Sequence, residues 1–194
     1  MRELFWQYVI NLYQDVPTEV YEGLLSVFCI GAVGLIAFLG WKRGWKKVVG
    51  LLLVEYVFFI YCSTVIFRTR VEEVGHNFTP FWSYNHPELL VENIMNVVAF
   101  VPVGILIGVM ADVRGMMDER RWKKGWQVAL IVGTGLGISV SIETMQYFFH
   151  LGFSELDDVM HNTIGCFLGF GVTQIARIAQ KKEGSQKSRK GQKY

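Results

Sequence analysis

Residues 93–111 read NIMNVVAFVPVGILIGVMA, a long run without a single charged side chain. A helix of roughly 20 such residues covers the ~30 Å of hydrocarbon in a bilayer. Only helices and closed barrels satisfy the backbone hydrogen bonds in lipid, and this run lacks the alternating pattern of a barrel strand. The stretch therefore predicts a transmembrane helix.

Four further apolar runs flank this stretch, at residues 24–41, 48–67, 126–149 and 159–178. The second contains Glu55 and the fourth contains Glu143. Hydrophobic residues make up 52% of the chain and charged residues only 19%, whereas a soluble domain usually carries about a quarter charged residues. We predict an all-α fold, a polytopic membrane helix bundle with five transmembrane helices in one membrane domain at residues 20–180.

Residues 1–18 are too polar to span a membrane. Their apolar side chains recur with a helical period, and Glu3, Gln7 and Asp15 occupy the opposite face. We expect an N-terminal amphipathic helix that lies in the membrane interface or packs on the bundle. This segment lacks the pattern of a cleavable signal peptide, so we expect the first span to direct insertion itself.

Basic residues decide the expected orientation. Of the 19 Lys and Arg residues, all but Arg2, Arg68 and Arg70 fall in loops 42–47 and 114–124 or in the tail from residue 177. The positive-inside rule assigns these loops and the tail to the cytoplasm and the N-terminus to the outside. Residues 181–194 are hydrophilic and predicted to be disordered, near anionic lipid rather than nucleic acid. The chain is expected to be a multi-pass protein of a bacterial plasma membrane.

With this orientation, polar side chains gather at the outer ends of the spans. Ionisable residues inside a membrane are costly and usually have a partner or a function. Glu143 and Gln146 share one helix face, as do Asp158 and Asn162. Facing lipid would leave these groups unsatisfied, so we expect them to meet in an outer-leaflet pocket. Its predicted members are Arg68, Asn93, Asn96, Glu143, Gln146, Asp157, Asp158 and Asn162.

Three kinds of role are open for this pocket beside simple interhelical hydrogen bonding, which contributes about 0.6 kcal/mol per contact. The first is binding of a polar head group. The second is a membrane-embedded, metal-assisted hydrolase or transferase acting on a lipid-linked substrate. In that case Asp157, Asp158 and His161 hold a divalent cation and Glu143 is the base, although the sequence lacks HExxH. The third is a small transporter that relays protons through Glu55 and Glu143.

Small residues predict where helices approach closely. Gly133, Gly137 and Ser141 form one series at four-residue spacing, and Gly165 and Gly169 form another. Pro102 interrupts the third span and removes one helical hydrogen bond there.

Five motifs follow one another in a fixed order along residues 50–177. They are Arg68; Asn77-Phe-Thr-Pro80-Phe81; Glu92-Asn93-x2-Asn96-x3-Phe100-x-Pro102-x-Gly104; Glu143-x2-Gln146; and Asp157-Asp158-x3-Asn162-x2-Gly165. Together they resemble the VanZ-like family, which is named for a membrane protein linked with glycopeptide (teicoplanin) resistance.

The resemblance implies an integral protein of the bacterial cell membrane and, in some members, reduced sensitivity to lipid-anchored glycopeptides. It implies no particular reaction. Pro80, Phe81, Pro102, Gly104 and Gly165 are expected to be structural motif residues. The expected partners are the lipid bilayer and a lipid-linked cell-wall precursor or lipoglycopeptide, whose head group would bind in the pocket.

Overall fold

The computed structural model describes residues 23, 26–28, 30–32, 34, 45–66, 68, 75–113 and 124–191. Its main helices are α3 (Trp45–Tyr61), α4 (Leu90–Val113), α5 (Lys124–Phe149) and α6 (Leu156–Gly191). A π-helix, η1 (Cys62–Ile66), prolongs α3, and two 3-10 turns, η2 (Trp82–Asn85) and η3 (Pro87–Leu89), precede α4. The predicted all-α class is confirmed.

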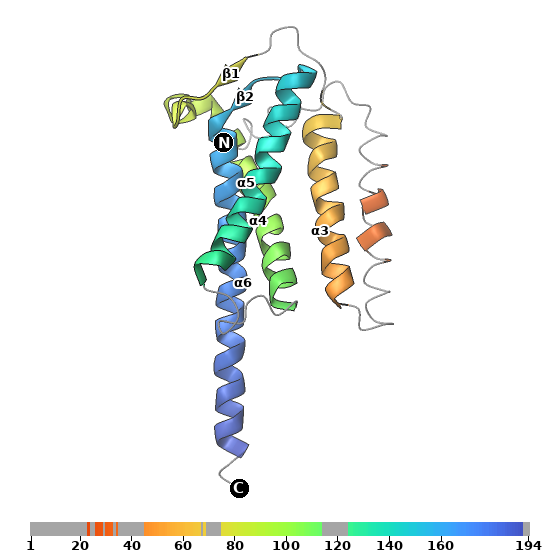
Figure 1. Ribbon diagram of the computed structural model, residues 1–194, viewed down its shortest axis with the longest axis vertical. Coiled ribbons are helices and arrows are strands. Elements are labelled where there is room, and N and C mark those ends of the chain that lie inside the picture. Colours follow the sequence, from red (N-terminus) through yellow and green to blue (C-terminus); the bar gives the residue numbers. More distant parts are fainter. Residues whose placement is uncertain are drawn as a thin grey trace.

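Four helices alternate in direction along the bundle, so that consecutive helices run antiparallel (Figure 1). Helix α6 packs against both α4 and α5, and α3 packs against α4. The buried core lies between them and includes Ile60, Phe100, Val103, Ile107, Ile131, Ile142, Cys166 and Phe170. Many large apolar side chains on the outer faces are exposed, as expected for helices that face lipid.

Three helices are long and apolar enough to cross a membrane: Val48–Ile66, Pro87–Asp112 and Gly125–Phe149. They correspond to the predicted spans at 48–67, 93–111 and 126–149, and they identify the chain as a membrane protein. The predicted span 159–178 is helical within α6, but α6 is not among the helices apolar enough to span. Most of the predicted span 24–41 and the amphipathic segment 1–18 lie outside the described residues, so the total of five spans stays a prediction.

Glycines allow α4 and α6 to pack backbone to backbone. A Cβ added to Gly104 would overlap the carbonyl of Cys166, and one added to Gly165 would overlap the carbonyl of Val97. A Cβ added to Gly169 would likewise overlap the carbonyl of Val101. The predicted close approach at Gly165 and Gly169 is therefore present, and it explains why Gly104 and Gly165 must lack a side chain.

The series at Gly133 and Gly137 behaves differently. A Cβ at either position would have no described atom within 4 Å, so no described helix approaches α5 closely at these two glycines. Further along the same face, Ser141 contacts α3 through a hydrogen bond between its hydroxyl and that of Tyr61. Spacing of small residues alone cannot indicate which face meets a neighbour.

Helix α6 corrects one prediction from the sequence. It continues past residue 181 to Gly191, whereas a disordered tail was predicted for residues 181–194. Lys, Gln, Arg and Glu are good helix formers, and elongation from a formed helix avoids the cost of nucleation. Arg177 Nε also lies 3.2 Å from Asp112 Oδ1 at the end of α4, which fixes α6 just before this extension.

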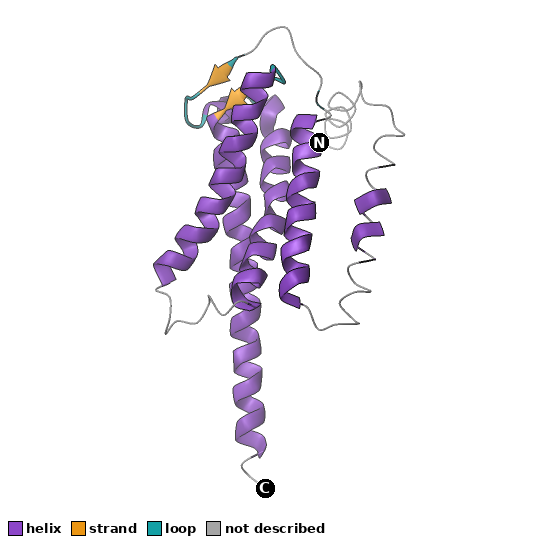
Figure 2. Ribbon diagram, turned by 45° about the vertical axis from the view of Figure 1, so that its right-hand side comes forward, coloured by secondary structure: helices purple, strands orange, loops and turns teal. Residues whose placement is uncertain are grey.

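Two short strands cover the opposite end of the bundle, far from the C-terminus (Figure 2). Strand β1 (His76–Asn77) pairs in parallel with β2 (Ser154–Glu155), and His76 lies opposite Ser154. The end of η1 and the starts of α4 and α6 reach the same end of the molecule (Figure 1). This arrangement brings together segments that lie far apart in the sequence, such as the end of η1 at Ile66 and the start of α6 at Leu156.

Candidate functional site

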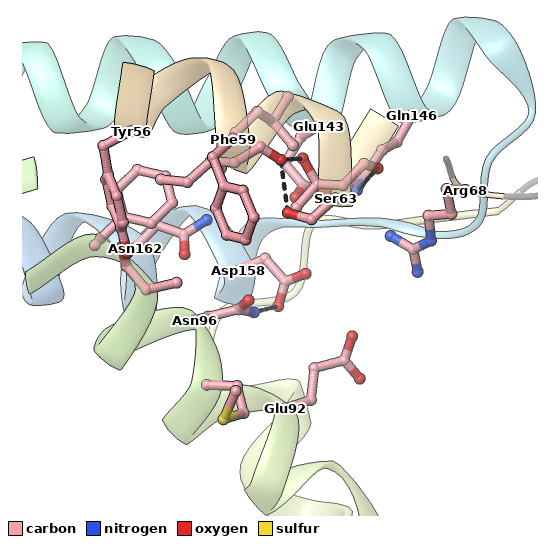
Figure 3. A pocket seen from close by; sticks show the side chains of 16 residues that line it. Tyr56, Phe59, Ser63, Arg68, Glu92, Asn96, Glu143, Gln146, Asp158 and Asn162 are labelled. Carbon is pink, nitrogen blue, oxygen red and sulfur yellow. Dashed lines mark hydrogen bonds between the residues drawn. The ribbon is translucent and has the colours of Figure 1, made fainter. Parts of the chain in front are cut away.

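A cavity of about 150 Å³ lies between α3–η1, α4, α5 and α6 (Figure 3). Its lining residues Glu92 and Asp158 belong to the first turns of α4 and α6, at the end of the bundle that the strands cover. Six of the eight predicted pocket residues line the cavity: Arg68, Asn96, Glu143, Gln146, Asp158 and Asn162. Its other lining residues are Tyr56, Phe59, Ile60, Ser63, Thr64, Glu92, Met95, Ala99, Phe100 and Ile142. The remaining two predicted residues, Asn93 and Asp157, lie elsewhere.

The π-helix η1 shapes the α3 side of the cavity. Ser63 and Thr64 donate their hydroxyl hydrogens to the carbonyl of Ile60. Gln146 on α5 donates from Nε2 to the carbonyl of Thr64 at 3.1 Å. Short π-helical segments occur often at functional sites, and here the segment lets α5 bind the backbone of η1 directly.

Two amide–oxygen contacts set α6 against α4 and α5. Asn96 Nδ2 donates to Asp158 Oδ1 at 2.7 Å (Figure 3). Asn162 Nδ2 contacts Ser139 Oγ at 2.8 Å. Asp158 and Asn162 are four residues apart and therefore share one face of α6, and both line the cavity.

Glu143 is the buried carboxylate on the α5 side, with only 6% of its surface exposed. Its Oε2 accepts a hydrogen bond from the backbone N–H of Glu155 at 3.0 Å, which ties α5 to strand β2. Burial, together with neighbouring Glu92 and Asp157, raises the pKa of Glu155. Acidic groups are thus concentrated around this end of the cavity.

Arg68 is the one basic residue among the described residues that line the cavity. Its guanidinium lies over Gly152, where an added Cβ would come within 3.2 Å of Nη2. Gly152 also has a φ of +141°, a conformation that side chains rarely adopt. Within the described part of the chain, Arg68 forms no direct ion pair with a carboxylate.

Asp157 belongs to a separate cluster, which we call the Asp157 clamp: Phe81, Ser83, Asn93 and Asp157. The Oδ1 atom of Asp157 accepts a hydrogen bond from the backbone N–H of Phe81 at 2.7 Å. The Oδ2 atom of Asp157 accepts two hydrogen bonds from Ser83, one from the backbone N–H at 2.8 Å and one from the hydroxyl at 2.7 Å. Asn93 Nδ2 donates to the same Ser83 hydroxyl oxygen at 3.1 Å.

The clamp fixes the loop before α4. Phe81 has a φ of 63°, which is unusual for a residue with a side chain. Burial alone would raise the pKa of Asp157, but the hydrogen bonds from Ser83 and Phe81 outweigh it and lower that pKa. Pro80 and Phe81, expected as structural motif residues, thus belong to the loop that Asp157 fixes.

The suggested metal ligands Asp157, Asp158 and His161 do not form a common site. Both oxygens of Asp157 bind the loop, Asp158 lines the cavity, and His161 Nε2 lies 3.1 Å from the hydroxyl of Tyr84. Over the described residues, no three His, Cys, Asp or Glu side chains come together as a metal would require.

Sequence reasoning missed several residues of both clusters. Ser83 lies in an irregular loop, where no helical period reveals its partner. Tyr56 and Phe59 were not among the predicted pocket residues, yet they line the cavity. Their spacing from Ser63 was the available signal, because positions 56, 59 and 63 recur on one helix face.

The fold and the cavity define a helical membrane protein with a polar site inside its bundle. A model of the VanZ/LLP1 family matches residues 47–177, and the chain belongs to this family. "Protein VanZ" of Enterococcus faecium is 31% identical over 93 residues, which is 48% of each chain. The chain thus matches about half the length of this curated relative. No solved structure matches the chain.

Proposed function

We propose that this chain acts in the bacterial cell envelope by binding the head group of a lipid, a lipid-linked cell-wall precursor or a lipoglycopeptide. Binding would lower the sensitivity of the cell to teicoplanin-type glycopeptides. One observation carries the proposal: charged and amide side chains from four separate segments converge on one cavity. So many polar groups inside an apolar bundle are costly unless they have partners or a function, and their convergence on one cavity favours a function.

The location of the cavity supports a role at the outer leaflet. The cavity is lined by Glu92 and Asp158 from the starts of α4 and α6. These starts lie at the end of the bundle that β1 and β2 cover, and the basic C-terminal part of α6 points the other way (Figure 1). The positive-inside rule assigns that basic end to the cytoplasm. Membership of the VanZ/LLP1 family supports a resistance-associated role for the chain.

Binding is favoured over a metal-assisted reaction because the candidate ligands are divided between two clusters. Both oxygens of Asp157 are bound by the loop, so Asp157 is not free to ligate the same metal ion as Asp158. No described contact favours proton relay by Glu55 and Glu143 over ligand binding.

The proposal is tested with purified full-length protein and fluorescently labelled probes. One probe is a teicoplanin-type lipoglycopeptide and the other is a lipid-linked cell-wall precursor. We expect at least one probe to bind, and Glu143→Gln and Asp158→Asn each to weaken its binding by about tenfold. Asp112→Asn, a matched change of a carboxylate at the far end of α4, should leave binding unchanged. Equal affinity in all variants, or no binding of either probe, would contradict the proposal.

Cells provide the second readout. Expression of the wild-type chain in a sensitive bacterium should raise the teicoplanin concentration needed to stop growth, and Asp158→Asn should abolish that increase. Membrane levels of both proteins must be equal, as measured by immunoblotting of the membrane fraction.

A further inference from the structure

We infer that the ligand carries a primary ammonium next to an anionic phosphate or carboxylate, so that a small zwitterionic end enters the cavity. This inference rests on the proposed function and narrows its ligand class. It follows from the hydrogen-bonding groups of the cavity, from its charge and from its size.

The cavity offers a buried acceptor that lacks a donor. Gln146 is 3% exposed, and its Nε2 donates to the carbonyl of Thr64. Because a carbonyl can only accept, this contact fixes which end of the amide faces η1. The other end, Oε1, is buried and has no hydrogen-bond partner within the described residues. A donor group on the ligand would satisfy this acceptor.

Asn162 repeats this arrangement on α6. It is 5% exposed, its Nδ2 contacts Ser139, and its Oδ1 has no partner in the described part of the chain. Two nearly buried amides on different helices thus line one cavity, each with an unpartnered oxygen. A donor-rich group satisfies both more readily than a neutral acceptor could.

The charges of the cavity favour a cation with a neighbouring anion. Three carboxylates, from Glu92, Glu143 and Asp158, line it together with the single guanidinium of Arg68. A protonated primary amine brings positive charge and three N–H donors. A trimethylated amine brings the same charge without any donor. The guanidinium of Arg68 presents a planar set of donors that suits a phosphate or carboxylate.

The volume of the cavity limits what can enter. A cavity of about 150 Å³ in a protein interior holds benzene, which has roughly six non-hydrogen atoms. The present cavity has about the same volume. It therefore admits the end of a head group and not a whole disaccharide or a glycopeptide core. Two sources supply this chemistry: a phospholipid with an ethanolamine head group and a peptide end with a free amine and a carboxylate.

Equilibrium binding to the purified full-length chain in detergent, measured by native mass spectrometry, tests the inference. The probes are phosphatidylethanolamine, phosphatidylcholine and phosphatidylglycerol with identical acyl chains, and a lysine-containing tripeptide with a free carboxylate. We expect phosphatidylethanolamine or the tripeptide to bind about tenfold more tightly than phosphatidylcholine and phosphatidylglycerol. Which of the two binds more tightly identifies the source.

Two variants connect this preference to the cavity. Gln146→Met removes the unpartnered acceptor, and Asp158→Asn removes a charge but keeps an oxygen for Asn96. Each should abolish the tenfold preference for the primary amine, and Asp112→Asn should retain it. Thermal unfolding of each variant in the same detergent shows that the fold persists.

The outcomes separate this inference from the proposed function. If phosphatidylcholine or phosphatidylglycerol binds as tightly as the amine probes, the inference is overturned and binding of a head group still stands. If Gln146→Met and Asp158→Asn both keep the preference, the cavity is not its origin and the inference is also overturned. If none of these probes binds, and neither the labelled lipoglycopeptide nor the labelled precursor binds, both proposals are refuted.

Discussion

Asp157 and Asp158 are neighbours in the sequence and belong to two different regions of the molecule. Asp157 accepts three hydrogen bonds from the loop at Phe81 and Ser83. Asp158 lines the cavity and accepts one from Asn96. We therefore assign Asp157, whose two oxygens both accept hydrogen bonds from the loop, to the maintenance of the fold. We assign Asp158, which can accept further hydrogen bonds, to the binding site.

Helix geometry produces this division. Successive residues on an α-helix are rotated by about 100°, so a pair of adjacent acids at the start of α6 points in two directions. The same comparison applies on α4, where Asn93 joins the clamp and Asn96 joins the cavity. A motif with paired polar residues can therefore combine one structural and one binding position.

Loss of Asp157 should have the largest effect. Asp157→Ala leaves the N–H groups of Phe81 and Ser83 and the Ser83 hydroxyl without their acceptor. We expect a loss of about 3 kcal/mol or more of stability, because hydrogen bonds to a charged group contribute roughly 1.5–3 kcal/mol each and do not add fully. The measurement is the midpoint of thermal unfolding in detergent. An unchanged midpoint would mean that the clamp does not hold the loop.

Gly165→Ala should lower both the stability of the protein and its affinity for the head group, with a loss of stability smaller than that of Asp157→Ala. A Cβ at this position overlaps the carbonyl of Val97 and should push α6 away from α4, at a cost of about 1–3 kcal/mol. The contact between Asn96 and Asp158 should lengthen, so binding of the head group should weaken together with stability. Gly171→Ala is the matched control on α6, because an added Cβ meets no described atom within 4 Å. If Gly171→Ala were as harmful as Gly165→Ala, close packing would not be the cause.

The pH dependence of the clamp should be smaller and has a defined sign. The pKa of Asp157 is lower in the folded protein than its ordinary value, which is about 3.9 in unfolded chains. Its contribution is therefore complete above about pH 4 and is lost as the pH falls through the lowered pKa. The difference in unfolding midpoint between wild type and Asp157→Asn should shrink below about pH 4. A difference that stays constant from pH 6 to pH 2 would contradict the lowered pKa.

Much of the fold followed from the sequence, because long uncharged runs have few alternatives in lipid. The helices over residues 48–66, 90–113 and 124–149 agree with the predicted spans to within a few residues. The helical structure of residues 181–191 could not be predicted from the sequence, because a charged composition suits both a solvated helix and a disordered tail. Helix α6 also combines a polar first turn with an apolar middle, which weakens its hydropathy signal.

The candidate site was predictable where residues lay on regular helices. Spacing placed Glu143 with Gln146 and Asp158 with Asn162, and each pair lines the cavity. Spacing could not assign Asp157 and Asn93, because their partners lie in an irregular loop about 75 and 10 residues away. The orientation of a side chain toward a loop depends on tertiary structure, for which the sequence gives no period.

One pair of substitutions tests the division between the two aspartates most directly. Asp157→Asn and Asp158→Asn make the same chemical change at adjacent positions, and each protein is measured for unfolding midpoint and for head-group binding. We predict that Asp157→Asn lowers the midpoint and that the protein that remains folded binds normally, whereas Asp158→Asn keeps the midpoint and binds about tenfold more weakly. Two variants that lose stability and binding in the same proportion would contradict the assignment of separate roles.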